Sequence, residues 1–568
     1  MSNNDDQIQR EIEIIDSVAN KGSLQKAKAY SKLSGPGWLQ SAITLGGGSL
    51  GSAMFLAVMG GFAILWVQPF AMLMGVILLA AISYVTLSIK RTPFQALRQD
   101  INPVLAWGWL AASQLANMIW VLPQYSLSYG AITDNLFPGL FESSKDSNVT
   151  KYIVSFVILG LMLFVNFLGS RKGRGYRIYE NILKVLVGIV VLCFMGVVVR
   201  LAGTLDWGAI FCGFIPNPSM IWNPADAYND ILKTLPSAEA REYWTAVVLK
   251  AQRDPMVAAT AAAVGINMTF LMPWALRARK WGRKHRGLSR FDLATGMMIP
   301  FVIATACVVI AAGSQFHGKP FEGLITEENG AVVVHEESGK FKDYSKAIAT
   351  RNGKVKDVPV ADGEKTLAAM LIKRDTKQLA GALESLFGNS MVAQKVFGIG
   401  VLAMGLSTIS ILMLISGFVA CEVAGKPRDS MAFKVGTLLA STGVLWPLLW
   451  GGQSKAYLAV TTSTFGYVLF PIAFLAFVIM INSKKVLGDQ VPTGRAKLAW
   501  NIPLISALVI TGLAAGWTGW NKKLIIKNEA GEITTDLAMG KWFIIIFAIL
   551  VVIGFFLPKK ETQSATDP

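Results

Sequence analysis

Long apolar stretches, each close to twenty residues, recur along the whole chain of 568 residues. About 20 residues at a rise of 1.5 Å per residue cross the hydrocarbon core of a bilayer as an α-helix, whereas core strands are shorter and bounded by turns. The pattern predicts an all-α integral membrane protein with about twelve spans, surrounded by membrane lipid. The expected spans are 36–59, 62–88, 103–132, 151–169, 178–202, 256–276, 291–315, 395–423, 431–451, 456–482, 498–519 and 541–557.

Basic residues are concentrated in alternate connections between these spans. The net charge is +17, which in a soluble protein would suggest a nucleic-acid partner. Here the positive-inside rule explains the charge, because every even-numbered connection becomes cytoplasmic and basic if the N-terminus lies inside. We therefore expect an inner (plasma) membrane protein with both termini in the cytoplasm, and no nucleic-acid partner. The most basic connection contains Arg277, Arg279, Lys280, Arg283, Lys284, Arg286 and Arg290.

The spans also divide the chain into parts. A polar tail, expected to be cytoplasmic and to carry a short surface helix, precedes two groups of five spans, and two further spans follow them. In the second long external segment, Asn329-Gly330 before a valine run predicts a β-hairpin. We interpret this segment as a small cap, and favour a covering role over a functional lid. The expected parts are the tail 1–34, spans 1–5 in 35–202, an external segment 203–255, spans 6–10 in 256–482 with an external insert 316–394, and 483–568 with two spans and a cytoplasmic tail.

The first span contains a glycine-rich run that is poorly suited to a continuous helix. Gly46, Gly47, Gly48 and Ser49 are consecutive at mid-span, and each glycine costs about 1 kcal/mol relative to alanine in a helix. Close packing by small residues is the alternative explanation. Three consecutive glycines exceed what packing needs, so we expect an unwound segment. Unwound backbone is tolerated in a membrane where it lines a cavity or is buried in protein.

The sixth span contains a second potential interruption. Gly265, Asn267 and Thr269 precede Met272-Pro273 in this span, and an ordinary proline kink is the alternative to a break. Spans 1 and 6 open the two halves of a five-plus-five arrangement, and interrupted helices at corresponding positions point to a transporter binding site. The candidate substrate-binding residues are Gly46, Gly47, Gly48, Ser49, Asn267, Thr269 and Met272.

Several further motifs resemble one known family. They include Gly35-Pro36-Gly37 ahead of the glycine run, Gly61-Phe62-Ala63-Ile64-Leu65-Trp66, Asp206-Trp207-Gly208, and Phe397-Gly398 with Gly405-Leu406-Ser407-Thr408. In this order, over most of 35–480, the sequence resembles the Nramp (natural resistance-associated macrophage protein) metal transporters. The resemblance implies the five-plus-five inverted-repeat fold of the LeuT type, shared with the sodium-coupled amino-acid symporters, with two extra C-terminal helices. It also implies alternating access of a divalent metal cation to a site at mid-membrane.

The residues that bind metal in this family are replaced here. The family uses Asp and Asn of a DPGN motif, Met of an MPHN motif and a Gln of span 8. DPGN corresponds to Gly46–Ser49, MPHN to Thr269–Met272 or, in another register, to Met272-Pro273, and the glutamine to Leu406. A dehydrated divalent cation needs an anionic ligand to offset its lost hydration. We therefore do not expect tight binding of a transition metal.

Proton coupling is also not expected. Where the family has carboxylates in span 3, the best register places Gln114 and Gln124, and an amide does not titrate near neutral pH. Interhelical hydrogen bonding is the alternative role for both glutamines. Ser407 and Thr408 resemble the hydroxyl pair that binds sodium in related symporters, with back-bonding to their own helix as the alternative. Trp274 directly follows the second interruption and is a further candidate lining residue.

These observations predict a secondary transporter of a small solute, which by resemblance is a divalent metal cation. Sodium-coupled transport of an organic solute, or ligand binding by a receptor that does not transport, remain alternatives. We expect neither an enzyme nor a cofactor, because the glycine run lies inside a span rather than in a phosphate-binding loop.

Overall fold

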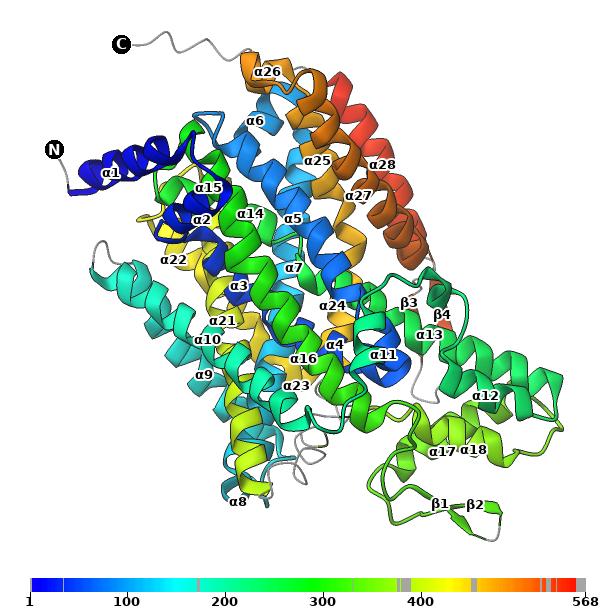
Figure 1. Ribbon diagram of the computed structural model, residues 1–568. Coiled ribbons are helices and arrows are strands. Elements are labelled where there is room, and N and C mark those ends of the chain that lie inside the picture. Colours follow the sequence, from blue (N-terminus) through cyan, green and yellow to red (C-terminus); the bar gives the residue numbers. More distant parts are fainter. Residues whose placement is uncertain are drawn as a thin grey trace.

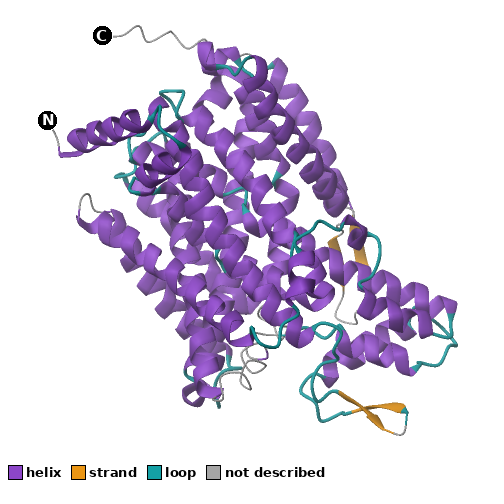
Figure 2. Cartoon of the chain, viewed as in Figure 1, coloured by secondary structure: helices purple, strands orange, loops and turns teal. Residues whose placement is uncertain are grey.

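The computed structural model describes residues 3–33, 35–170, 174–328, 330–374, 378, 390–450, 457–520, 524–527, 533–537 and 539–557. It is a bundle of long helices with a smaller lobe at one end, and the two termini lie at the opposite end (Figures 1 and 2). The helices of the first half are α3 (Pro36–Thr44), α4 (Gly47–Gly60), α5 (Val67–Thr86), α6 (Pro93–Ala96), α7 (Pro103–Gly130), α8 (Pro138–Phe141), α9 (Asn148–Ser170) and α10 (Arg174–Leu201).

The second half repeats the series of spans and ends with two additional helices. Its helices are α13 (Ala238–Ala263), α14 (Met268–Ala278), α15 (Arg286–Leu293), α16 (Ile299–Phe316), α21 (Ser390–Ala424), α22 (Met431–Leu438), α23 (Trp446–Leu449), α24 (Tyr457–Leu469), α25 (Pro471–Ile481), α26 (Lys484–Leu487), α27 (Gly494–Trp520) and α28 (Met539–Phe556). Short 3₁₀ or π segments join some of them at Gly61–Ile64, Leu97–Ile101, Ala131–Leu136, Pro218–Ile221, Arg283–His285, Ala294–Met298, Leu439–Leu445 and Gly488–Gln490.

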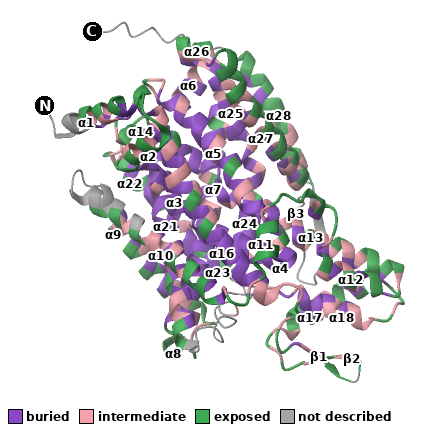
Figure 3. Cartoon of the chain, viewed as in Figure 1, coloured by how far each residue is buried: buried purple, intermediate pink, exposed green. Residues whose placement is uncertain are grey.

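The predicted spans agree with the helices. Among the described residues, ten helical stretches are long and apolar enough to cross a membrane, and 185–201 and 540–556 form two shorter apolar helices. Together they match the twelve expected segments in order. The peripheral helices α9, α10, α27 and α28 expose many large apolar side chains, among them Phe156, Phe164, Leu513 and Ile553. Such surfaces suit contact with lipid chains, while the buried residues gather in the middle of the bundle (Figure 3).

One helix extends well beyond the predicted span. The helix that enters the sixth span begins at Ala238, not near residue 256, so part of the segment predicted to be external is helical. Its first half carries Glu239, Arg241 and Glu242 among apolar residues, so the hydropathy of the sequence does not distinguish it from a loop. The helix therefore extends from the bundle into the lobe.

That lobe, which we call the cap, consists of 203–237 and 317–374. It contains α11 (Trp207–Gly213), α12 (Asp226–Thr234), the antiparallel strands β1 (Ile325–Glu328) and β2 (Ala331–Val334), α17 (Phe341–Asn352) and α18 (Asp362–Met370). The predicted hairpin is present, although Asn329 itself lies outside the described residues. A buried ion pair joins α17 to α18, with Arg351 Nε 2.6 Å from Glu364 Oε2. Trp244 of α13 donates to the same carboxylate at 2.8 Å, which fixes the cap on this helix.

The N-terminal tail forms α1 (Asn3–Val18) and α2 (Ser23–Ser31), in agreement with the expected surface helix. The Trp281 indole donates to Glu11 at 3.1 Å, and Lys284 pairs with Asp16 at 2.6 Å. The tail thus packs on the connection between α14 and α15. A second antiparallel hairpin, β3 (Leu524–Lys527) and β4 (Ile533–Leu537), lies between α27 and α28 and was not expected.

Candidate functional site

The first helix is interrupted at the glycine run. α3 ends at Thr44, Leu45 leaves helical geometry, Gly46 is extended at φ −111° and ψ −178°, and α4 begins at Gly47. This φ is open to any residue, so the conformation does not require glycine. Glycine is required here because there is no space for a side chain: a Cβ on Gly46 would lie 2.4 Å from Thr408 Oγ1. The glycine lets α21 approach the break directly.

A side chain from α7 provides a hydrogen-bond acceptor at the start of α4. The backbone N–H of Gly47 donates to Gln124 Oε1 at 2.8 Å, while Gln124 Nε2 donates to the Trp120 carbonyl at 3.2 Å. The first N–H groups of a helix have no partner within the helix and need an acceptor from elsewhere. Ser49 Oγ donates to the Thr44 carbonyl across the break. The first interruption is therefore held mainly by its neighbours.

The second interruption separates α13 from α14 at 264–267. Asn267 Oδ1 accepts from the Met268 N–H at 2.9 Å, and Asn267 Nδ2 donates to Asn117 Oδ1 at 2.9 Å. Asn117 in turn donates to the Leu412 carbonyl at 2.6 Å. Asn267 thus caps its own half-helix and ties it to α7, which is tied to α21.

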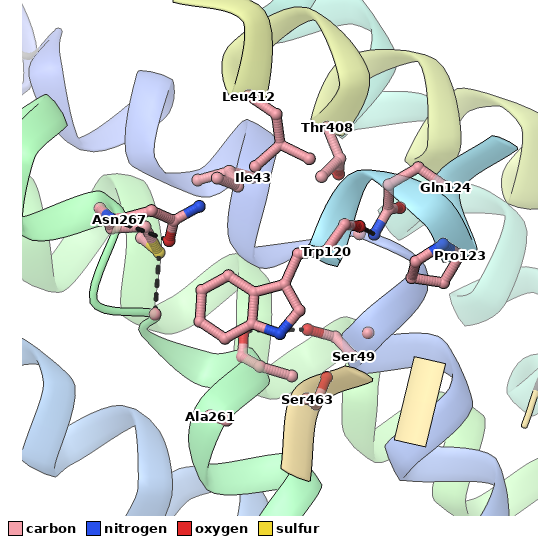
Figure 4. A pocket seen from close by; sticks show the side chains of 15 residues that line it. Ile43, Ser49, Trp120, Pro123, Gln124, Ala261, Asn267, Thr408, Leu412 and Ser463 are labelled. Atoms are coloured by element: carbon pink, nitrogen blue, oxygen red, sulfur yellow. Dashed lines mark hydrogen bonds between the residues drawn. The ribbon is translucent and has the colours of Figure 1, made fainter. Parts of the chain in front are cut away.

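A small cavity of about 40 Å³ lies between the two interruptions. At about 10–15 Å³ per water, it holds roughly three water-sized groups. Figure 4 shows its lining, with the Trp120 ring between Asn267 on one side and Ser49 and Ser463 on the other. The lining residues are Ile43, Gly46, Gly48, Ser49, Trp120, Pro123, Gln124, Ala261, Ala262, Gly265, Asn267, Met268, Thr408, Leu412 and Ser463.

The structure brings half of the candidate residues together around this cavity. Gly46, Gly48, Ser49, Gln124, Asn267 and Thr408 line it. Gly47 lies beside it, in contact with Gln124. Thr408 Oγ1 is 3.4 Å from the Ala42 carbonyl at the end of α3, so this hydroxyl points toward the break.

The other five candidates have different contacts. Thr269 accepts from the Trp109 indole at 2.7 Å, Met272 Sδ accepts from Gln40 Nε2 at 3.5 Å, and Gln114 donates to Ser416 at 3.2 Å. Ser407 donates to the Met404 carbonyl of its own helix at 3.1 Å. The Trp274 ring stacks on Phe418 at 4.9 Å. None of these five is among the residues that line the cavity.

Of the lining residues that were not among the candidates, three have side chains with a sulfur, nitrogen or oxygen atom. Met268 lies one turn before Met272, so the thioether nearest the cavity comes from a register that was not considered. Trp120 lines the cavity and donates to the Thr462 carbonyl at 3.1 Å. Ser463 belongs to the run Thr461-Thr462-Ser463-Thr464, whose density of hydroxyl groups in an apolar span was a usable signal.

The chemistry of the lining is neutral. It offers backbone carbonyls, the hydroxyls of Ser49, Thr408 and Ser463, and two amides, and no lining residue carries a formal charge. Met268 Sδ accepts from the Gly265 N–H at 3.4 Å, so this sulfur already has a donor. Within the described part of the chain, no group of three or more His, Cys, Asp or Glu side chains could hold a metal ion. The arrangement suits a ligand that is recognised through oxygen atoms and helix ends.

The helix arrangement defines a class of membrane protein: a five-plus-five inverted repeat of the LeuT type with two extra helices, in which the first helix of each half is interrupted. The family described as natural resistance-associated macrophage protein-like (Nramp) matches residues 37–349 and 365–518. The chain belongs to this family, as its motifs suggested.

The individual proteins that match this chain have low sequence identity to it. A divalent metal cation transporter, MntH of Brucella suis biovar 1 (strain 1330), is 26% identical over 309 residues, which cover 49% of this chain and 61% of that protein. A mutant of the Eremococcus coleocola manganese transporter has a similar fold, with a TM-score of 0.60 at 13% identity and coverage of 94% of this chain and 96% of that one. The same transporter in complex with an aromatic bis-isothiourea compound gives a TM-score of 0.59.

Proposed function

We propose that the protein is a secondary transporter of a divalent metal cation that keeps part of its hydration shell in the site. The transported ion occupies the cavity between the two interrupted helices, and the two halves of the bundle alternate its access to either side. Family membership supports the class of cargo. The observation that carries the proposal is the neutral, oxygen-rich lining of a cavity at the meeting point of two helix breaks.

The lining chemistry favours a hydrated ion over a bare transition metal. A dehydrated Mn²⁺ in a medium of low dielectric needs a carboxylate to offset its lost hydration, and soft ligands select it further. Ser49, Asn267 and Thr408 can instead accept hydrogen bonds from water molecules that remain on the ion. Mg²⁺ loses its water reluctantly and is therefore well suited to such a site.

We also propose that transport is not coupled to protons. Gln124 contacts the first break, and Gln114 donates to Ser416 within the bundle. Neither amide can carry a proton by ionising near neutral pH. Sodium coupling is the second candidate, and one contact favours it: Thr408 Oγ1 lies 3.4 Å from the Ala42 carbonyl beside the break. A hydroxyl with carbonyls at an unwound helix is a plausible sodium ligand set.

The test is uptake of Mg²⁺ and Mn²⁺ into proteoliposomes, each with and without an imposed pH gradient or sodium gradient. We expect saturable uptake of Mg²⁺ at least as strong as that of Mn²⁺, with no response to the pH gradient. A tenfold or larger preference for Mn²⁺, or uptake that follows the pH gradient, would contradict the proposal. Acceleration by a sodium gradient that Thr408→Val removes would establish the sodium site.

A control variant and two further measurements distinguish the transporter from the alternative functions. Gly48→Trp should abolish uptake, because the indole would fill the cavity beside Ser463 and Ala262. An intact protein that binds a ligand, as shown by ligand-stabilised melting, but moves none would be a receptor. Flux of an organic solute with sodium, and of no metal, would support the other alternative.

The orientation is proposed with the same function. The basic connections between spans support cytoplasmic termini in the inner membrane, and the cap then faces outward. Protease added to intact cells should cleave within 330–374 and leave the N-terminal tail uncut.

A further inference from the structure

The last residues of the cap are held in place by buried contacts next to the end of α16. Arg374 is almost fully buried, and its guanidinium donates to the carbonyls of Met370 at 3.3 Å, Ile372 at 3.2 Å and Lys319 at 2.8 Å. The same group lies 5.1 Å from the ring centre of Phe316, at the end of α16. These contacts fix the backbone next to Arg374, and with it the position of Lys373.

The side chain of Lys373 reaches the cap-side end of α24. Its Nζ lies 3.5 Å from the ring centre of Tyr457, a close cation–π contact. The edge of the Tyr457 ring meets Phe55 of α4, with ring centres 5.0 Å apart and planes at 90°. The ammonium group therefore lies over the Tyr457 ring, which packs against Phe55 and so joins two of the helices around the cavity.

These helices place Lys373 above the cavity on the cap side. Phe55 lies ~6 residues beyond Ser49 on α4, and Tyr457 lies ~6 residues before Ser463 on α24, which is roughly 9 Å at 1.5 Å per residue. The end of α4 meets the cap, since Tyr228 of α12 donates to the Val58 carbonyl at 3.0 Å. The two rings and Lys373 therefore lie between the cap and the level of the cavity along these two helices.

Several charged groups face this ammonium from the surrounding elements. The pKa of Lys373 is lowered to about 8, mainly by burial, with smaller contributions in the same direction from Lys250 of α13 and Lys346 of α17. Asp254 of α13 and Asp343 of α17 act in the opposite direction, since they stabilise the charged form. Lys373 is therefore largely protonated near neutral pH and loses its charge as the pH rises above about 8.

We propose that Lys373 is a cap-side gate that selects by charge, whose ammonium group over Tyr457 holds cations back from the cavity until it is displaced or neutralised. The inference rests on the proposed function in one respect, the use of the cavity as the substrate site. It adds a specificity-determining residue supplied by the cap. A positive charge in a partly buried position repels a cation more strongly than it would in water.

The test measures access to the cavity rather than transport. Ala262→Cys places a thiol in the lining, in a chain that also carries Cys212→Ser to remove the exposed native thiol. Sealed vesicles whose cap faces the medium are treated with a cationic trimethylammonium-ethyl methanethiosulfonate or with a neutral alkyl methanethiosulfonate of similar size. The rate obtained without Ala262→Cys is subtracted. Each rate is compared between Lys373, Lys373→Gln and Lys373→Arg, with Lys346→Gln as a control that removes a nearby exposed charge.

At neutral pH we expect Lys373→Gln to speed the cationic reagent about 10-fold, and the neutral reagent less than about 2-fold. Lys373→Arg and Lys346→Gln should leave both rates close to those of the parent chain. At about pH 9, the ratio of cationic to neutral rates should rise in the parent chain and stay constant in the Gln and Arg variants. Equal cationic rates with Lys373 and with Gln would overturn the gate, and so would an equal effect of Lys346→Gln. Absence of metal flux would overturn the proposed function and leave this result unaffected.

Discussion

The two interrupted helices solve the same structural problem with different residues. Both must break inside a bundle where water is scarce and still satisfy the freed backbone groups. In the first, the chain contributes glycines, and Gln124 of α7 supplies the acceptor for the Gly47 N–H. In the second, Asn267 caps its own half-helix and reaches out to Asn117. One break depends on space left for its neighbours, and the other depends on a side chain of its own.

This difference has a consequence for how each break responds to mutation. At the first break, an added side chain is harmful because α21 and α7 already occupy the space. At the second, loss of a side chain is harmful because it leaves buried polar atoms without partners. Four substitutions test this difference, and they should lower the stability to decreasing extents.

Gly46→Val should have the largest effect. Its Cβ would lie 2.4 Å from Thr408 Oγ1 and 3.0 Å from the Ile43 carbonyl, so α3 and α21 must move apart. Overpacking of this kind costs about 1–3 kcal/mol, and we expect the upper end of that range. Thermal unfolding in detergent measures the loss. Thr408→Ala should recover part of the stability in the double variant, and no recovery would show that the backbone, not the contact, requires glycine.

Asn267→Ala should have the next largest effect. It removes one of the two acceptors of the Met268 N–H, which also donates to the Gly265 carbonyl at 3.0 Å, and leaves Asn117 Oδ1 without its donor in a buried site. The unpaired buried oxygen costs about 1–3 kcal/mol. Asn267→Asp is the matched control, because it keeps the capping oxygen but places a second carboxyl oxygen against Asn117 Oδ1 in place of the donating amide nitrogen. We expect the Asp variant to unfold at a temperature between those of the parent and the Ala variant. An Ala variant as stable as the parent would refute the self-capping account.

The sequence predicted the breaks better than it predicted the residues around them. The consecutive glycines of the first span and the segment from Asn267 to Pro273 in the sixth are local signals. Apolar spans of about twenty residues are local signals too, so the fold could be predicted from short-range patterns. The position of Met272 against Gln40, or of Trp120 across the cavity, depends on which face of a helix meets which neighbour. A shift of one helical turn exchanges Met272 for Met268, and composition does not fix that turn. The polar half of α13 was missed because hydropathy detects membrane depth rather than helicity.

Gln124→Ala should have a smaller effect on stability than Asn267→Ala. It removes the acceptor of one N–H at the start of α4, a loss comparable to that of a helix cap, about 0.5–2 kcal/mol. The space it leaves adjoins the cavity, so water can replace the lost oxygen. Gln124→Glu keeps an acceptor there and adds a carboxylate to the neutral lining. If the proposed cargo is correct, this Glu variant should bind Mn²⁺ more tightly than the parent chain does, as isothermal titration would measure. If Gln124→Ala lowered the stability more than Asn267→Ala does, the first break would depend on a side chain more strongly than the second, which would contradict the comparison.

Gly48→Ala should have the smallest effect on stability, although it lies only two residues from Gly46. Its Cβ would lie 3.3 Å from Ser463 Oγ and 3.4 Å from Ala262 Cβ, a tight contact that small shifts relieve. Gly48 lies in the first turn of α4, where alanine gains part of the about 1 kcal/mol that it gains over glycine in a helix interior, and this gain offsets that contact. The unfolding temperature should therefore stay within a few degrees of the parent, while the methyl group takes volume from the cavity and lowers uptake. A variant as unstable as Gly46→Val would mean that the whole glycine run serves packing. Stability retained with uptake reduced would divide the run into Gly46, which makes room for a neighbouring helix, and Gly48, which makes room for the ligand.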